Sequence, residues 1–140
     1  MAGELITRTN RVVDLTTGTR VLTINDAGGT FTNLGSSSGV TFTLPAGCPV
    51  GLEFTFVVLV AEDLVVKLPA VGTGVGQKLI YDTQDFNGQF AYGLAASLIG
   101  STCVILCLDN TLESEQFIVK SWTGVIPYGD VGPWKYSPPS

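Results

Sequence analysis

The chain has 140 residues, with seven basic against twelve acidic side chains and no histidine. Its net charge of −5 argues against nucleic-acid binding, which needs clustered lysine and arginine to displace counterions from phosphates. Charged residues make up only 14% of the chain and hydrophobic residues 45%, whereas a typical domain has about 25% charged residues. This composition excludes intrinsic disorder. It predicts one globular domain, part of whose apolar surface is covered by another chain.

Targeting signals and cysteine usage indicate a protein made in the cytoplasm. The longest apolar run, residues 56–61, is far shorter than the roughly 20 residues that a membrane-spanning helix needs. The start of the chain lacks the basic and apolar segments of a secretory signal. Three cysteines, an odd number, fit free thiols in a reducing compartment. Cys103 and Cys107, four apart on one expected strand, would be about 13 Å apart, so we expect buried thiols that share neither a metal ion nor a disulfide.

Short apolar runs of period two, separated by turn residues, predict β-strands along most of the chain. The clearest alternation is in residues 40–44, where Val40, Phe42 and Leu44 would face a core. Residues 52–60 are apolar on both faces, which predicts a strand covered on both sides by a second sheet or another subunit. Residues 94–99 fit either a helical turn or a strand. The expected strands span residues 11–15, 20–24, 30–33, 40–44, 52–60, 64–68, 78–81, 102–108 and 116–122.

This arrangement predicts an all-β domain over residues 11–123, with a β-sandwich or jelly-roll-like topology. Residues 1–10 are polar and weakly patterned, and we expect an N-terminal arm. Residues 124–140 contain four prolines and three glycines, which forbid a helix and interrupt a sheet ladder.

The aromatic residues of this last segment are unusual for a linker. They predict an extended C-terminal tail that lies along a partner surface, or that packs on its own domain and covers a sheet edge. We take the aromatic residues of the tail and two arginines near the start of the chain as interface candidates. They are Arg8, Arg11, Tyr128, Trp134 and Tyr136.

The sequence contains few motifs of the kind found in catalytic or ligand-binding sites. Without histidine, the commonest general base and the usual zinc ligand are missing. Residues 72–78 are rich in glycine but lack the spacing of a phosphate-binding Walker loop, so we expect a surface turn. Glu53 is expected within a strand and Glu62 and Asp63 at a hairpin. Nothing in the sequence supports the convergence in a cleft that paired catalytic carboxylates need. We expect no catalytic residues, no enzyme activity and no cofactor.

Two acidic segments contain oxygen ligands of the kind that calcium prefers. Their spacing departs from the EF-hand loop, and we expect solvated loops and no metal site. The residues are Asp82, Asp85 and Asn87 in the first segment, and Asp109, Asn110, Glu113 and Glu115 in the second.

Three segments together carry a resemblance to a known class of proteins. Residues 26–35 (DAGGTFTNLG) lead into residues 40–46 (VTFTLPA) and 51–58 (GLEFTFVV), and residues 100–106 (GSTCVIL) precede an acidic loop and residues 117–124 (FIVKSWTG). This order resembles small β-rich virion proteins of tailed bacteriophages, most of all head decoration (cement) proteins, and also tail-fibre and tailspike β domains. The chain departs from such proteins just before the last strand, where Gln116 and Phe117 follow a longer acidic loop.

The resemblance implies a homotrimer of β-sandwich protomers that binds the major capsid protein on the outside of the phage head. Such a protein would stabilise the head against the pressure of packaged DNA, and would bind neither nucleic acid nor membrane. The alternative is a tail-fibre or head-fibre domain that binds host surface glycans through aromatic residues in loops. Its candidate residues are Tyr81, Phe86, Phe90 and Tyr92.

Overall fold

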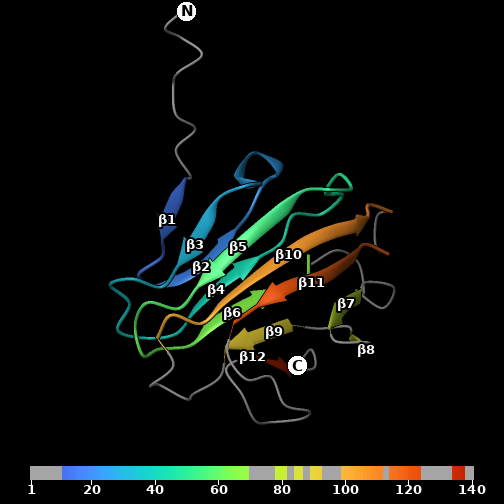
Figure 1. Ribbon diagram of the computed structural model, residues 1–140. Coiled ribbons are helices and arrows are strands. Elements are labelled where there is room, and N and C mark those ends of the chain that lie inside the picture. The colour runs from blue at the N-terminus through green and yellow to red at the C-terminus, as the bar shows by residue number, and fades with distance from the viewer. Residues whose placement is uncertain are drawn as a thin grey trace, which may run out of the picture.

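The chain folds into two β-sheets in the computed structural model, which describes residues 11–69, 78–81, 84–86, 89–92, 99–111, 114–123 and 134–137 (Figure 1). The seven-stranded sheet has the order β1 (Val12–Asp14), β3 (Thr30–Thr32), β5 (Glu53–Val57), β10 (Thr102–Asp109), β11 (Gln116–Trp122), β7 (Lys78–Tyr81) and β8 (Gln84–Phe86). The five-stranded sheet has the order β12 (Trp134–Ser137), β9 (Gln89–Tyr92), β6 (Leu64–Lys67), β4 (Val40–Thr43) and β2 (Gly18–Val21). The prediction of a mostly β protein is confirmed.

The first six strands alternate between the two sheets. Strands β1, β3 and β5 are parallel neighbours in one sheet, while β2, β4 and β6 are parallel neighbours in the other. A tight hairpin cannot join two parallel strands, so a longer connection must link them. Here the connection between two parallel strands of one sheet passes through a strand of the other sheet, as β2 does between β1 and β3. A jelly roll consists of antiparallel strands, so the jelly-roll expectation does not describe these six strands. Antiparallel pairing is found where β10 joins β5 and β11, and where β9 joins β6 and β12.

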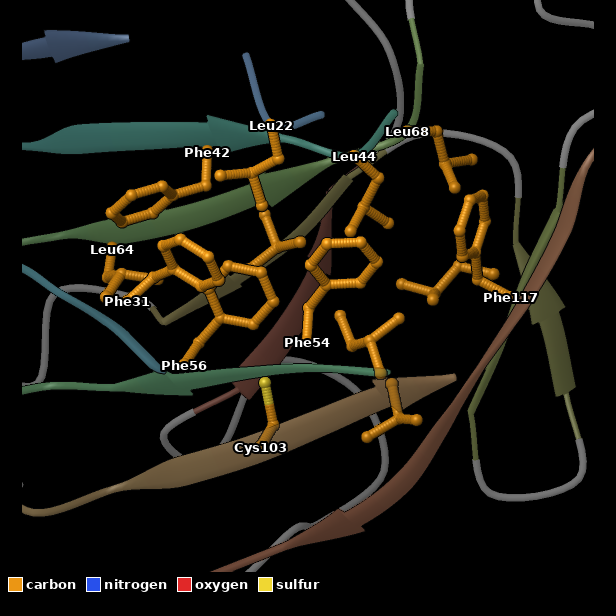
Figure 2. Packing of buried hydrophobic residues seen from close by; sticks show 14 of the residues in the cluster. Leu22, Phe31, Phe42, Leu44, Phe54, Phe56, Leu64, Leu68, Cys103 and Phe117 are labelled. Carbon is orange, nitrogen blue, oxygen red and sulfur yellow. The ribbon is translucent and has the colours of Figure 1, made fainter. Parts of the chain in front are cut away.

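One buried cluster receives side chains from both sheets. Phe31, Phe54 and Phe56 extend from the seven-stranded sheet toward Phe42 of the five-stranded sheet (Figure 2). The ring centroids of Phe31 and Phe42 are 5.5 Å apart, and those of Phe42 and Phe56 are 5.6 Å apart, both within the range of favourable tilted ring pairs. The alternation in residues 40–44 is confirmed, since Val40, Phe42 and Leu44 are all buried.

Strand β5 is buried on one face only. Phe54 and Phe56 lie in the core, whereas Glu53, Thr55 and Val57 on the other face are half-buried. The strand expected over residues 52–60 is therefore shorter than predicted, and its second face is only half-buried within the protomer. Cover of that face by another subunit stays a prediction. The second face of β5 carries a glutamate and a threonine, and the strand ends at Val57.

The fully buried Asn33 explains why β5 does not continue. Its Oδ1 accepts hydrogen bonds from the backbone N–H groups of Leu59 (2.8 Å) and Val60 (3.1 Å). Its Nδ2 donates to the carbonyl oxygens of Val60 (3.2 Å) and Glu62 (3.0 Å). These bonds satisfy backbone groups that a longer strand would pair with a neighbouring strand.

The expected strand over residues 20–24 also differs, because β2 ends at Val21 and a 3-10 turn, η2 (Ile24–Asp26), follows. The Asp26 side chain accepts a hydrogen bond from the Thr23 backbone N–H at 2.8 Å. Thr23 and Asp26 form a capping box, which stabilises a helical turn rather than an extended strand.

Part of the C-terminal segment pairs with the domain itself. Strand β12 is antiparallel to β9, with Trp134 opposite Tyr92 and Ser137 opposite Gln89. The strand lies between Pro133 and Pro138, and it forms the edge of its sheet, where proline nearby is tolerated. The expected interruption of sheet pairing does not apply to these four residues. Residues 1–10, 94–98, 124–133 and 138–140, on which other expectations depend, lie outside the described residues.

The shared aromatic cluster predicts a large effect of truncating Phe42. We expect Phe42→Ala to lower the free energy of unfolding by about 3–5 kcal/mol, because it leaves a cavity between the two sheets. Denaturant unfolding measures this change. Val21→Ala on the neighbouring strand β2 is the matched control, since Val21 is 66% exposed, and it should change stability by less than about 0.5 kcal/mol. Equal effects of the two substitutions would contradict the described core.

Candidate interaction surface

Three segments meet at one end of the strands. Residues 22–29 connect β2 to β3, residues 44–52 connect β4 to β5, and residues 107–111 end β10. The Gly28 N–H donates to the Glu53 carbonyl oxygen at 2.7 Å, and the Gly51 N–H donates to the Cys107 carbonyl oxygen at 2.9 Å. The segments follow one another along the upper edge of the molecule in Figure 1. We call these three segments the loop end.

Exposed aliphatic side chains gather at the loop end. Ile24 is 51% exposed, Val50 61% and Leu108 40%, one on each of the three segments. Val12 and Val21, also exposed, lie at the adjacent ends of β1 and β2. Exposed apolar residues that cluster mark interaction sites more often than scattered ones do. Within the described residues, this end is therefore the best candidate for an interaction surface.

Loop 44–52 is held firmly against β10 and β11. The Gly47 N–H donates to Oε2 of the fully buried Glu115 at 3.0 Å. The Cys107 thiol donates to the Cys48 carbonyl oxygen at 2.9 Å. A surface that is already ordered loses less conformational entropy on binding, so this anchoring favours association through Val50.

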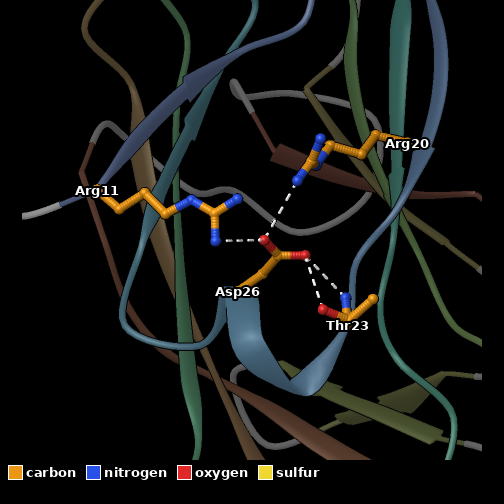
Figure 3. Close-up of polar contacts among 4 residues, drawn as sticks. All are labelled: Arg11, Arg20, Thr23 and Asp26. Atoms are coloured by element: carbon orange, nitrogen blue, oxygen red, sulfur yellow. Dashed lines mark hydrogen bonds and ion pairs between the residues drawn. The ribbon is translucent and has the colours of Figure 1, made fainter.

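A buried carboxylate lies beside η2 at the loop end. Asp26 is only 3% exposed, and its Oδ1 lies 3.0 Å from the Arg11 guanidinium and 3.2 Å from that of Arg20. Figure 3 shows the two arginines approaching one oxygen from different sides, while Thr23 donates to the other oxygen. The cluster joins the start of β1 to β2 and η2. It therefore connects the edge strands of the two sheets.

Burial raises the pKa of the Asp26 carboxyl group, but its partners outweigh this effect. The Thr23 backbone N–H, the hydrogen bond and charge of Arg20, and the charge of Arg11 together lower the pKa below its ordinary value of 3.8. A depressed carboxyl pKa stabilises the folded state above the unfolded pKa, and this stabilisation is lost as the pH falls through the folded pKa. Asp26 therefore stabilises the fold at neutral pH. This contribution begins to decrease near the unfolded pKa of about 4 and is lost as the pH falls further, through the folded pKa.

The structure does not bring the predicted interface residues together. Arg11 is 52% exposed and pairs with Asp26 next to β1. Trp134 and Tyr136 belong to β12, which forms the edge of the five-stranded sheet opposite to β2. Their side chains, and all of Arg8 and Tyr128, lie outside the described residues. The exposed residues Ile24, Val50 and Leu108 were not predicted, because an isolated aliphatic residue in a turn or near the end of a strand gives no sequence signal.

The acidic residues do not form a paired site among the described residues. Glu53 begins β5 and pairs with Lys120 at 2.6 Å, whereas Glu62 and Asp63 lie beyond the other end of that strand. Asp109 accepts a hydrogen bond from the Thr111 N–H, while Glu115 is buried and binds Gly47. The described residues contain no group of three or more possible metal ligands. Asp82, Asn87, Glu113 and residues 72–77 are not among them.

The three cysteines are buried and free, as expected for Cys103 and Cys107. In the part of the chain that the structure describes, no helix has the length and hydrophobicity to span a membrane. The aromatic residues considered for glycan binding belong to strands rather than loops. Tyr81 and Phe86 lie on β7 and β8, and Phe90 and Tyr92 lie on β9 of the other sheet.

We compared the sequence with protein-family models and with curated proteins. No protein-family model matches this chain, and no curated protein matches it significantly.

The Asp26 cluster predicts a measurable loss of stability on neutralising the carboxylate. We expect Asp26→Asn to lower the free energy of unfolding by about 1–3 kcal/mol at pH 7, because both arginines lose a charged acceptor. Glu53→Gln is the matched control. Its ion pair with Lys120 is largely exposed, and such pairs contribute about 0–1 kcal/mol.

The same pair of variants tests the pH dependence. Wild type should lose the stability advantage over Asp26→Asn as the pH falls from about 5 to below 4. Urea unfolding at a series of pH values measures the difference. A difference that stays constant down to pH 2 would show that the Asp26 carboxylate is not the group responsible.

Proposed function

We propose that this protein is a structural component of a tailed-bacteriophage virion, a capsid decoration (cement) protein that acts as a homotrimer on the outside of the head. The observation that carries the proposal is the exposed aliphatic surface at the loop end, formed by Ile24, Val50 and Leu108. The resemblance of residues 26–58 and 100–124 to such proteins supplies the class of partner. The proposed partners are further copies of this chain and the major capsid protein.

A β-sandwich protomer is the architecture that we propose for the trimer. Its support is the single core shared by the two sheets, in which Phe42 contacts rings of the opposite sheet at 5.5 and 5.6 Å. Strands β1 and β2 are free edges at the same side of both sheets within the described residues. A threefold ring uses two different patches on each protomer, and the loop end beside these edges would be one of them.

Burial of the loop end gives a physical account of association. Full burial of an exposed aliphatic side chain contributes about 1.5–3 kcal/mol. Ile24, Val50 and Leu108 are already partly buried, so each would contribute less than this. Together with neighbouring polar contacts, the patch would form the apolar centre of an interface, and a stable interface buries about 1,200–2,000 Å² in total.

Stabilisation of a phage head follows from mass action. A protein that binds the assembled shell but not the separated capsomers shifts the equilibrium toward the shell. The partner is then protein, with which the net charge of −5 is compatible. Glycan binding is not favoured by the structure, since its aromatic candidates are distributed over strands of both sheets.

The proposal predicts the mass of the protein in solution. Light scattering at micromolar concentration should give three times the chain mass of 14.7 kDa, because the loop end is buried between copies. A mass of one chain over the whole accessible concentration range would contradict the trimer.

A charge placed in the apolar patch should weaken this association. We expect Val50→Asp to raise the dissociation constant of the trimer at least about tenfold, which corresponds to roughly 1.4 kcal/mol. Ile99→Asp is the matched control, because Ile99 is 58% exposed and lies at the opposite end of the strands. Sedimentation equilibrium measures both dissociation constants. If the two substitutions had equal effects, the loop end would not be part of the interface.

Binding to phage heads tests the virion role separately. Wild-type protein added to heads that lack it should cosediment with them and raise the temperature at which they release DNA. If the protein formed a trimer but neither bound the heads nor protected them, the self-association would stand and the decoration role would be refuted.

A further inference from the structure

Two buried thiols meet beneath the loop end. Cys48 lies in loop 44–52 and Cys107 near the end of β10, 59 positions later in the chain. Both are fully buried and free. The Cys107 Sγ lies 2.9 Å from the Cys48 carbonyl oxygen, to which the thiol donates a hydrogen bond. Neither cysteine has a role in the proposed association.

The backbone on both sides of the pair is fixed by hydrogen bonds. The Gly51 N–H donates to the Cys107 carbonyl oxygen, and the Cys107 N–H donates to the Leu52 carbonyl oxygen, both at 2.9 Å. On the other side of Cys48, the Gly47 N–H donates to Glu115 at 3.0 Å. The loop and the strand are therefore already held side by side at the two cysteines.

We propose that Cys48 and Cys107 form a disulfide on exposure to a peroxide, and that this bond locks the loop carrying Val50 to the strand carrying Leu108. One thiolate attacks the peroxide and becomes a sulfenic acid, and a peroxide oxygen leaves as water. The second thiol attacks the sulfenic sulfur, which releases a second water and forms the S–S bond. Both sulfurs are oxidised and the peroxide is reduced, so two thiols and one hydrogen peroxide give one disulfide and two waters.

Cys103 is the natural comparison within the same protein. It is fully buried on the same face of β10. Two cysteines four positions apart on an extended strand are about 13 Å apart, which is beyond the reach of a disulfide. Because the Cys48 carbonyl oxygen contacts the Cys107 thiol, Cys48 lies at the far end of this span from Cys103. The geometry therefore favours the Cys48–Cys107 pairing.

The local environment makes the reaction slow at neutral pH. Burial raises the pKa of Cys48 to about 12, with a further contribution from Cys107. Burial also raises the pKa of Cys107, and the charges of Asp109 and Glu115 oppose its ionisation. Because the thiolate is the reacting species, the rate should rise about tenfold per pH unit between pH 7 and pH 9.

The bond would stabilise the fold and the loop end together. Closing a loop of this length restricts the unfolded chain, and we expect the Tm to rise by roughly 5 °C or more. Because the thiols lie inside one protomer, the reaction does not depend on the proposed trimer or on phage heads.

Peptide mapping of the full chain tests the proposal. Native protein is treated with hydrogen peroxide, the remaining thiols are blocked, and the digest is analysed without reductant. We expect a linked pair of peptides containing Cys48 and Cys107, with a mass about 2 Da below their sum, and its loss after reduction. Cys103→Ala should form the same link, whereas Cys48→Ala should not.

Two outcomes would overturn the proposal. One is that, after treatment of the native protein with peroxide, the Cys48 and Cys107 peptides are unlinked and their thiols are either free or oxidised to another product. The other is a link that involves Cys103. The wild-type map decides the matter even if a cysteine variant fails to fold. If the linked protein had the same Tm as the unlinked protein, the disulfide itself would stand, and its stabilising effect would be refuted.

Discussion

Packing of Phe31 and Phe56 against Phe42 across the space between two sheets is the interaction on which this structure depends. It exists because the chain passes from one sheet to the other at each of the first six strands. Strands β3, β4, β5 and β6 contribute alternate side chains to the same cluster, and Val13 of β1 packs against it. The core therefore joins residues far apart in the sequence, and the loops that make the crossings are displaced to the ends of the strands.

The composition of those loops gives the two ends different properties. At the loop end, Ile24, Val50 and Leu108 expose aliphatic side chains on segments held by internal hydrogen bonds. Beside them, Asp26 binds both Arg11 and Arg20, so most of the charge at this corner is paired within the protomer and one positive charge is left over. An ordered and largely apolar surface is well suited to permanent contact with protein. This arrangement links the low charge of the sequence to the proposed structural role.

Side-chain alternation predicted most of the strands, since Val40, Phe42 and Leu44 are buried as expected and β7 and β11 have the expected bounds. Strand neighbours were not predictable, because an alternating pattern does not encode which strand pairs with it or in which direction. Strands β8 and β9 were missed because they are short and polar residues such as Gln84, Asp85 and Gln89 interrupt their apolar pattern. Strand β12 was missed because the prolines on either side of it indicated an interrupted ladder. The turn at η2 did carry a signal, the Thr23–Asp26 capping box. The exposed residues of the loop end carried none.

Hydrogen exchange at two protein concentrations tests the central claim that the loop end is buried by other copies. At the higher concentration, the account predicts slower exchange of backbone amides in residues 22–29 and 46–52. Residues 34–39 at the opposite end are the internal control and should exchange at the same rate in both samples. Identical exchange of the loop end in dilute and concentrated protein would contradict the claim.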